Sequence, residues 1–164
     1  MSDCVIDTNV LLVASAAEPF SPFDDTHVPA REQLAVFEWL QAFRGDSARR
    51  LVLDDLFKIY EEYRHKLSDQ DYGLQVVHEK MEMFRTAEIA WNDDGSAVVP
   101  VEFSDFDPSD RKFLAAVLTA PETIDLVNAA DSDWLEIEAE LAAVGVRVIH
   151  IIEEWLRKSY GRVA

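Results

Sequence analysis

The chain has 164 residues, of which 49% are hydrophobic and 10% aromatic, and it contains a single cysteine. This length and composition fit one globular domain over residues 1–164, and they exclude a disordered protein and a scaffold held by internal disulfides. No apolar run is long enough to predict a membrane span, and acidic residues interrupt the N-terminal run where a signal peptide would be continuous. We therefore expect a cytoplasmic protein.

The chain has 32 acidic and 15 basic residues, so its formal net charge is −17. This charge limits the classes of partner that the chain is expected to bind. Nucleic-acid-binding proteins gain affinity from Lys and Arg side chains that neutralise phosphates. The negative charge is compatible with high solubility, with a basic partner protein, or with carboxylates that converge on metal ions. Only the positions of the acidic residues along the chain can distinguish these alternatives.

The N-terminal part of the chain predicts a strand, a sharp turn and two helices. Residues 4–7 form a short β-prone run, and Thr8 is a candidate N-cap for a helix that extends to residue 17. After a loop, a second helix is predicted over residues 29–43, and Gly45 is placed to end it. The apolar positions of this helix recur at three-residue intervals and are Leu34, Phe37, Leu40 and Phe43.

The middle of the chain predicts a second strand and two more helices. Residues 51–53 are a buried strand, and Asp54 and Asp55 follow it as caps of a third helix. The buried face of that helix is predicted to comprise Leu56, Ile59, Tyr60, Tyr63 and Leu67. A fourth helix is predicted over residues 72–86, with a buried stripe of Val76, Val77, Met81 and Phe84.

The C-terminal half continues the alternation of strand and helix. Further strands are predicted at residues 98–103, 123–127 and 146–151, and further helices at residues 108–118, 131–144 and 155–160. Strands that alternate with helices predict a parallel sheet with helices on both faces. We therefore predict the α/β class, as a three-layer α/β/α sandwich around a central, mostly parallel sheet of about five strands.

The acidic residues of interest follow the ends of predicted strands or begin the helices beside them. In an open parallel sheet, functional side chains gather beyond the carboxyl ends of the strands. If the strands pair as expected, carboxylates from separate segments can converge at this edge. The residues placed to reach it are Asp7, Glu61, Glu62, Asp110, Asp131 and Asp133.

Four segments resemble, in this order, the motifs of PIN-domain nucleases. VIDTNVLL is similar to the first motif, EEYRHKL to the helical segment with one essential Glu, DPSDRKFLAAVL to the third motif and NAADSDWL to the fourth. The resemblance extends from residue 7 to about residue 149 and implies a PIN-like fold. It implies that the catalytic metal ligands are Asp7, Glu62, Asp110 and Asp131, with Asp133 as a further ligand beside them. The spacing to Tyr63 and Leu67 favours Glu62 over Glu61.

Clustered carboxylates need a cation, because they repel one another and would otherwise take up protons. Ligands that offer only oxygen point to Mg²⁺ or Mn²⁺ rather than zinc. Two such ions roughly 3.5–4 Å apart could activate water and stabilise the leaving oxygen of a phosphodiester. We therefore predict a metal-dependent endoribonuclease that hydrolyses single-stranded or structured RNA, with DNA left open as a substrate.

Neighbouring side chains have candidate supporting roles. Thr8 and Asn9 are placed to orient Asp7 or a water molecule at the metal. The candidate phosphate-binding residues are Arg64, Lys66, Arg111 and Lys112. Because these cations are few, we expect weak intrinsic affinity for nucleic acid.

Several alternatives remain open at this stage. Many members of the family are toxins held inactive by an antitoxin, so the resemblance implies a toxin–antitoxin or defence role, a small basic antitoxin partner and a homodimer. The scarcity of basic residues also fits a PIN-like interaction module with little or no catalysis. Asp7 could serve only as a helix cap, and Asp110 only as a negative charge that complements the dipole at a helix N-terminus. A phosphatase-like or receiver-like site is disfavoured, because Thr8 and Asn9 stand where such sites place a second Asp.

Overall fold

The computed structural model describes residues 3–90, 103, 106, 110–120 and 124–163. Within these residues, five strands form one sheet in the order β3-β2-β1-β4-β5, and every neighbouring pair is parallel. The strands are β1 (Cys4–Ile6), β2 (Leu51–Asp54), β3 (Thr86–Ile89), β4 (Asp125–Asn128) and β5 (Arg147–His150). The predicted α/β class and central parallel sheet are confirmed.

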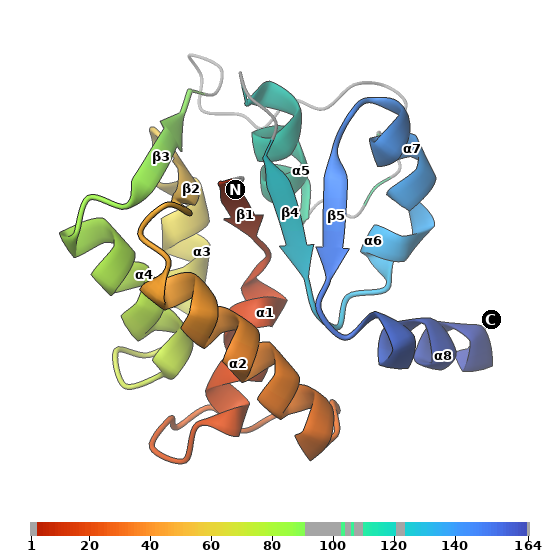
Figure 1. The fold of residues 1–164 in the computed structure, drawn as a ribbon, viewed down its shortest axis with the longest axis horizontal. Coiled ribbons are helices and arrows are strands. Elements are labelled where there is room, and N and C mark those ends of the chain that lie inside the picture. Colours follow the sequence, from red (N-terminus) through yellow and green to blue (C-terminus); the bar gives the residue numbers. More distant parts are fainter. Residues whose placement is uncertain (1–2, 91–102, 104–105, 107–109, 121–123, 164) are drawn as a thin grey trace.

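Helices surround this sheet as the two outer layers of an α/β/α fold (Figure 1). They are α1 (Thr8–Ala17), α2 (Ala30–Gly45), α3 (Lys58–Lys66), α4 (Tyr72–Glu82), α5 (Arg111–Thr119), α6 (Asp133–Glu136), α7 (Glu138–Ala143) and α8 (Glu153–Val163). Helix α5 packs on β1, β2 and β4, while α1 packs against α2, α3 and α4. Within the described part of the chain, none of the helices has the length and apolar character that crossing a bilayer requires.

The hydrophobic core lies between the sheet and these helices. The three residues of β1 are all buried, as are all four of β2 and of β4, which is expected for strands covered on both faces. Helix α4 approaches α1 closely at Gly73, where a Cβ atom would lie 2.6 Å from the carbonyl oxygen of Leu11. The described elements therefore share one sheet and one core.

The third strand differs from the prediction. Of the residues predicted to form it, 98–102 lie outside the described residues, and Phe103 has a 3₁₀-helical rather than an extended backbone. The strand beside β2 is instead Thr86–Ile89, although Thr86 was predicted to end a helix. The helix stops at Glu82 because Phe84 has a left-handed backbone with φ of 57°, and its side chain is 91% exposed rather than buried.

Several helix ends and faces also need correction. Thr8 is not the cap of α1, since Asp7 occupies that position and accepts a hydrogen bond from the Asn9 amide. Leu56 is exposed because α3 begins only at Lys58, and Leu34 is exposed as well.

The helix predicted over residues 131–144 is two short helices, α6 and α7, separated at Ile137. The helix predicted from residue 108 is described from Arg111 onward, and Pro108 lies outside the described residues. Likewise, Thr123 of the predicted fourth strand lies outside them, and β4 begins at Asp125.

Candidate metal-binding site

The candidate site lies where the strand order of the sheet reverses. From β1 the chain builds β2 and β3 on one side, and β4 and β5 on the other. In open α/β sheets, ligands bind outside the carboxyl ends of the strands at such a switch point. Asp7 directly follows β1, and Asp131 lies in the loop after the adjacent β4. The topology alone therefore places two carboxylates at the position where such sheets bind ligands.

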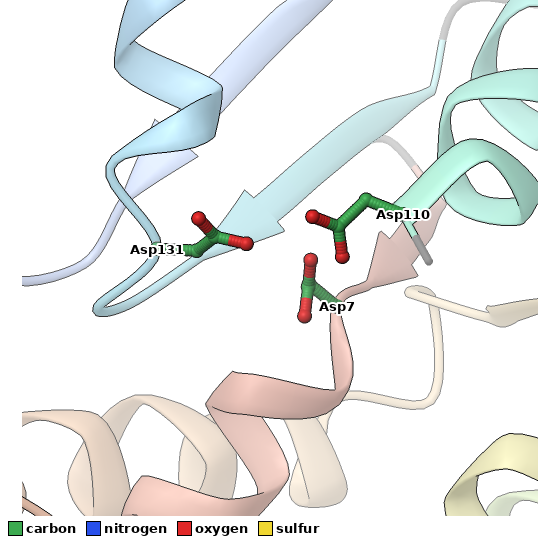
Figure 2. Close-up of side chains that lie close together, drawn as sticks. All are labelled: Asp7, Asp110 and Asp131. Carbon is green, nitrogen blue, oxygen red and sulfur yellow. The ribbon is translucent and has the colours of Figure 1, made fainter. Parts of the chain in front are cut away.

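Asp110 completes a group of three carboxylates at this point. It is the N-cap residue of α5, the helix that packs on β1 and β4. One carboxylate oxygen from each of Asp7, Asp110 and Asp131 lies within 4.8 Å of those of the other two. Figure 2 shows the three side chains directed toward one another from the end of β1, the start of α5 and the loop after β4.

Three hydrogen bonds hold Asp7 in this group. Its backbone amide donates to the Val127 carbonyl at 3.1 Å, which fixes the residue against β4. Its carboxylate accepts a hydrogen bond from the Asn9 amide at 3.0 Å and another from the indole N–H of Trp134 at 2.7 Å. The side chain therefore has one defined orientation, toward Asp110 and Asp131.

Burial raises the pKa of Asp7 from an ordinary value of 3.8 to about 6. The removal of water from around the carboxylate is the main cause, and the negative charge of Asp131 adds to it. The hydrogen bonds from Asn9 and Trp134 act in the opposite direction, because they stabilise the charged form. A cation at this position would favour the ionised state further.

The loop that carries Asp131 is fixed by the two asparagines Asn9 and Asn128. The side-chain oxygen of Asn9 accepts hydrogen bonds from the backbone amides of Ala129 at 3.1 Å and Ala130 at 2.8 Å. Its side-chain nitrogen donates to the oxygen of Asn128 at 3.0 Å. Asn9, predicted to orient Asp7, thus contacts the Asp131 loop through its side chain and Asp7 through its backbone.

Glu62 contacts Thr8 and Lys112, which are neighbours of Asp7 and Asp110 in the sequence, but it is not one of the converging group. Its carboxylate accepts hydrogen bonds from the hydroxyl of Thr8 and from the ammonium of Lys112 at 2.6 Å. The neighbouring Glu61 is exposed and forms an ion pair with Lys58 at 3.7 Å. Of these two glutamates, Glu62 is the one that faces the first turn of α1.

Helix α3 holds Glu62 in place through a buried tyrosine. The hydroxyl of Tyr63 donates a hydrogen bond to the carbonyl of Ile6, the last residue of β1. Burial raises the pKa of Tyr63 well above its ordinary value, so this donor stays protonated. The contact ties the middle of α3 to the strand that leads into Asp7.

The remaining predicted residues lie around the group of three. Asp133 lies in the first turn of α6 and is not one of the three converging residues; its backbone amide donates to the Asp131 carboxylate at 2.9 Å. Arg111, the first residue of α5, donates to the Phe106 carbonyl at 3.2 Å. Arg64 and Lys66 are exposed on α3, and Arg64 donates to the Tyr60 hydroxyl at 3.4 Å.

The sequence prediction missed two residues that shape this site, Trp134 and Asn128. Trp134 is fully buried and donates directly to Asp7, although from the sequence it was expected only in the core or on a partner-facing surface. Asn128 is buried at the end of β4 and bonds both the amide and the carbonyl of Asp131. A polar residue at the carboxyl end of a buried strand was the available signal for Asn128.

The arrangement is chemically suited to a hard divalent cation. Ligand oxygens around Mg²⁺ lie at roughly 2.0–2.1 Å from the ion, so neighbouring oxygens are roughly 3–4 Å apart. The oxygens of the three aspartates approach this spacing, within 4.8 Å of one another. Three carboxylates that share a partly buried position repel one another, and a cation would remove that repulsion. The residues therefore fit Mg²⁺ or Mn²⁺.

No protein-family model, no curated protein and no solved structure matches this chain. Its function must therefore be argued from the site itself.

Proposed function

We propose that this chain is a PIN-like, metal-dependent endoribonuclease that hydrolyses phosphodiester bonds of single-stranded or structured RNA. The observation that supports the proposal most strongly is the convergence of Asp7, Asp110 and Asp131 at the switch point of the sheet. These are three of the four catalytic residues that the resemblance to PIN-domain nucleases implies. They come from three separate segments of the chain, so their meeting is not a consequence of local sequence.

In this proposal Asp7, Asp110 and Asp131 hold Mg²⁺ or Mn²⁺. A bound divalent ion at such a site supplies an activated water molecule and stabilises the charge that develops on the leaving oxygen of a phosphodiester. Trp134 and the Asn9 amide keep the Asp7 carboxylate aimed at the site. Asn9 and Asn128 keep the Asp131 loop in position.

Glu62 and Lys112 extend the proposed site toward the substrate. Their ion pair of 2.6 Å lies next to Thr8, the first residue of α1. We assign Glu62 as a ligand acting through water, since its carboxylate is already engaged by Thr8 and Lys112. Lys112 follows Asp110 by two positions and, together with Arg111, is the candidate for contacting a phosphate. Arg64 and Lys66, exposed on α3, are the outer candidates.

The biological role is proposed only from the resemblance to PIN-domain nucleases. This resemblance implies a toxin–antitoxin or defence role in the cytoplasm, with a small basic antitoxin as partner and a homodimer. The net charge of −17 suits a basic partner protein better than a long stretch of RNA. We therefore expect cleavage of a short or structured RNA element rather than processive degradation.

The test compares wild type with Asp7→Asn and Glu61→Gln. Each protein is incubated with mixed-sequence single-stranded RNA, structured RNA and DNA in Mg²⁺, Mn²⁺ or EDTA. We expect metal-dependent cleavage of RNA by wild type and by Glu61→Gln, and none by Asp7→Asn. Glu61→Gln is the matched control, because it removes an acidic charge from the exposed side of α3 and leaves the aspartates intact.

The second candidate is a PIN-like interaction module with little or no catalysis. The excess of acidic residues, 32 against 15 basic ones, favours it, as does the use of Lys112 as a partner for Glu62. Titration with Mn²⁺ distinguishes the two. A nuclease must show saturable binding that Asp7→Asn abolishes, whereas a module without a metal would show neither binding nor a thermal shift.

A further inference from the structure

A chain of side-chain hydrogen bonds leads from the Asp131 loop to the end of β5. The amide of Asn128 is its central member, and it lies completely buried. Its oxygen accepts from the Asp131 amide at 3.2 Å and from the Asn9 side chain at 3.0 Å. Its nitrogen donates to the Asp131 carbonyl at 2.9 Å and meets Nδ1 of His150 at 3.0 Å.

The orientation of the Asn128 amide is determined by its backbone partners. The Asp131 N–H can only donate and the Asp131 carbonyl can only accept, so the oxygen and the nitrogen of Asn128 cannot be exchanged. The Asn9 amide is fixed in the same way, because its oxygen accepts from two backbone amides. Both hydrogens of the Asn128 nitrogen are therefore assigned, one to Asp131 and one to His150.

This assignment determines the state of His150. Its Nδ1 faces an N–H donor, so Nδ1 must be the acceptor and carry no proton. The ring is then neutral with its proton on Nε2. A proton on Nδ1, as in the imidazolium ion, would set two donors against each other. Relief would require the Asn128 amide to turn, which would break its contacts with Asp131.

We propose that His150, as the neutral Nε2–H tautomer, is a positioning residue that locks the Asn128 amide and thereby the loop carrying Asp131. As far as it concerns metal binding, this inference rests on the proposed function. In this proposal His150 acts through Asn128, whose side chain bonds the backbone of Asp131. Histidine suits the position because a ring nitrogen can accept a hydrogen bond from the amide within a buried site.

The surroundings of His150 are consistent with a neutral ring. The side chain is buried, and its Nε2 atom has no hydrogen-bond partner among the described residues. Glu138 of α7 faces Nε2 at 3.8 Å, too far for a hydrogen bond. The other charged groups that act on the ring are Glu153 and Arg157 of α8. Burial lowers the pKa of His150 from its ordinary value of 6.5, and Arg157 acts in the same direction, while Glu138 and Glu153 oppose it.

The test begins with the tautomer, which requires neither metal nor substrate. Long-range ¹H–¹⁵N spectra of the histidine rings distinguish a protonated from an unprotonated ring nitrogen. The chain has four histidines, and the spectrum of His150→Asn identifies which signals belong to His150. At pH 7.5 we expect a bare Nδ1 and a protonated Nε2. A protonated Nδ1, or a charged ring, overturns the proposal.

Two substitutions then separate positioning from simple packing. His150→Asn keeps a hydrogen-bond acceptor near the position of Nδ1, whereas His150→Leu removes it and leaves an N–H of Asn128 without a partner. We expect His150→Leu to speed hydrogen exchange of the Asp131 amide about tenfold or more, and His150→Asn to restore it toward wild type. Equal effects of the two substitutions would show that only packing matters and would overturn the proposal.

Metal affinity provides the link to the proposed function. Loss of a residue that orients a ligand weakens binding by about 10–100-fold, so we expect this loss of Mn²⁺ affinity for His150→Leu and most of it recovered in His150→Asn. If wild type itself bound no Mn²⁺, the proposed function would fail, while the tautomer and the Asp131 exchange rates would still decide the positioning role. Undiminished Mn²⁺ affinity in His150→Leu would overturn that role.

Discussion

Replacing Asp7 by asparagine removes a buried carboxylate from the candidate site while nearly preserving its size. In the folded protein burial raises the pKa of Asp7 to about 6, against an ordinary value of 3.8. The folded state therefore binds this proton more tightly than the unfolded state does. This tighter proton binding contributes to the unfolding free energy of the protein. The contribution is fully present below about pH 3.8 and is lost as the pH rises through about 6.

The magnitude follows from the size of the shift. A difference of about 2.2 pKa units corresponds to about 3 kcal/mol between the acid and neutral limits. By the same linkage, about 1.4 kcal/mol of this is lost between pH 5 and pH 7.5. For a chain of this size, that is a fall of about 3–6 °C in Tm. The Asp7→Asn variant cannot show this loss of unfolding free energy, because asparagine does not titrate.

The assay is urea unfolding of wild type and Asp7→Asn in EDTA at several pH values from 5 to 7.5. This range stays above the isoelectric point of about 4.4. Titrating groups far from Asp7 are common to both proteins, so they cancel in the difference between the two unfolding free energies. We expect that difference to shift by about 1.4 kcal/mol in favour of Asp7→Asn as the pH rises.

Adding Mn²⁺ should offset the fall in unfolding free energy that wild type shows as the pH rises, and it should do so for wild type alone. Binding to the folded state at a hundred times the Kd stabilises it by about 2.7 kcal/mol, and Asp7→Asn should gain far less. A free-energy difference that stays constant from pH 5 to 7.5 would refute the reasoning. It would mean that water reaches Asp7 and that its carboxylate is not confined among the other two.

Three further predictions concern residues that support the site or the fold. Trp134→Phe removes the N–H donor to Asp7, so the pKa of Asp7 should rise by about one to two units above that in wild type, and the pH midpoint of Mn²⁺ binding should move upward with it. An unchanged midpoint would show that this hydrogen bond does not act on the carboxylate. Gly73→Ala should destabilise the protein by about 1–3 kcal/mol in urea unfolding, because the new Cβ would meet the Leu11 carbonyl; a neutral result would show that α4 can move away from α1. Lys80→Met should lower the unfolding free energy by about 2–4 kcal/mol in the same measurement. The buried Lys80 ammonium donates to two backbone carbonyls of the loop after α2, and these carbonyls would lose their partner. A stabilised variant would contradict this prediction.

Much of the fold could be predicted from local patterns. The strand at β1, the helix of α1 and the strand at β2 lie close to their predicted positions, because hydrophobic periodicity and helix caps act over a few residues. The third strand could not be placed in this way. Only the last residue of Thr86–Ile89 is buried, so the segment carries little hydrophobic pattern. It forms a strand because the edge of β2 is available for pairing.

The candidate site was also predictable from the sequence only in part. Asp7, Asp110 and Asp131 were among the acidic residues expected at this edge, because each stands near the end of a strand or the start of a helix, and the resemblance to PIN-domain nucleases implied that they are ligands. The contacts of Glu62 with Thr8 and Lys112 could not be predicted, because they join segments whose relative placement depends on how α3 and α5 pack.

The sequence by itself determined the alternation of strands and helices, and with it the parallel sheet and the edge on which the acidic residues gather. These are local properties, since each follows from the periodicity of a short segment. Only the tertiary structure decided that β4 lies beside β1 and that α5 begins over their ends, which brings three carboxylates from distant segments within 4.8 Å of one another. It also decided that Trp134 and Asn128 hold two of them in place. Such contacts depend on strand pairing and side-chain packing across the whole chain, which no short stretch of sequence encodes.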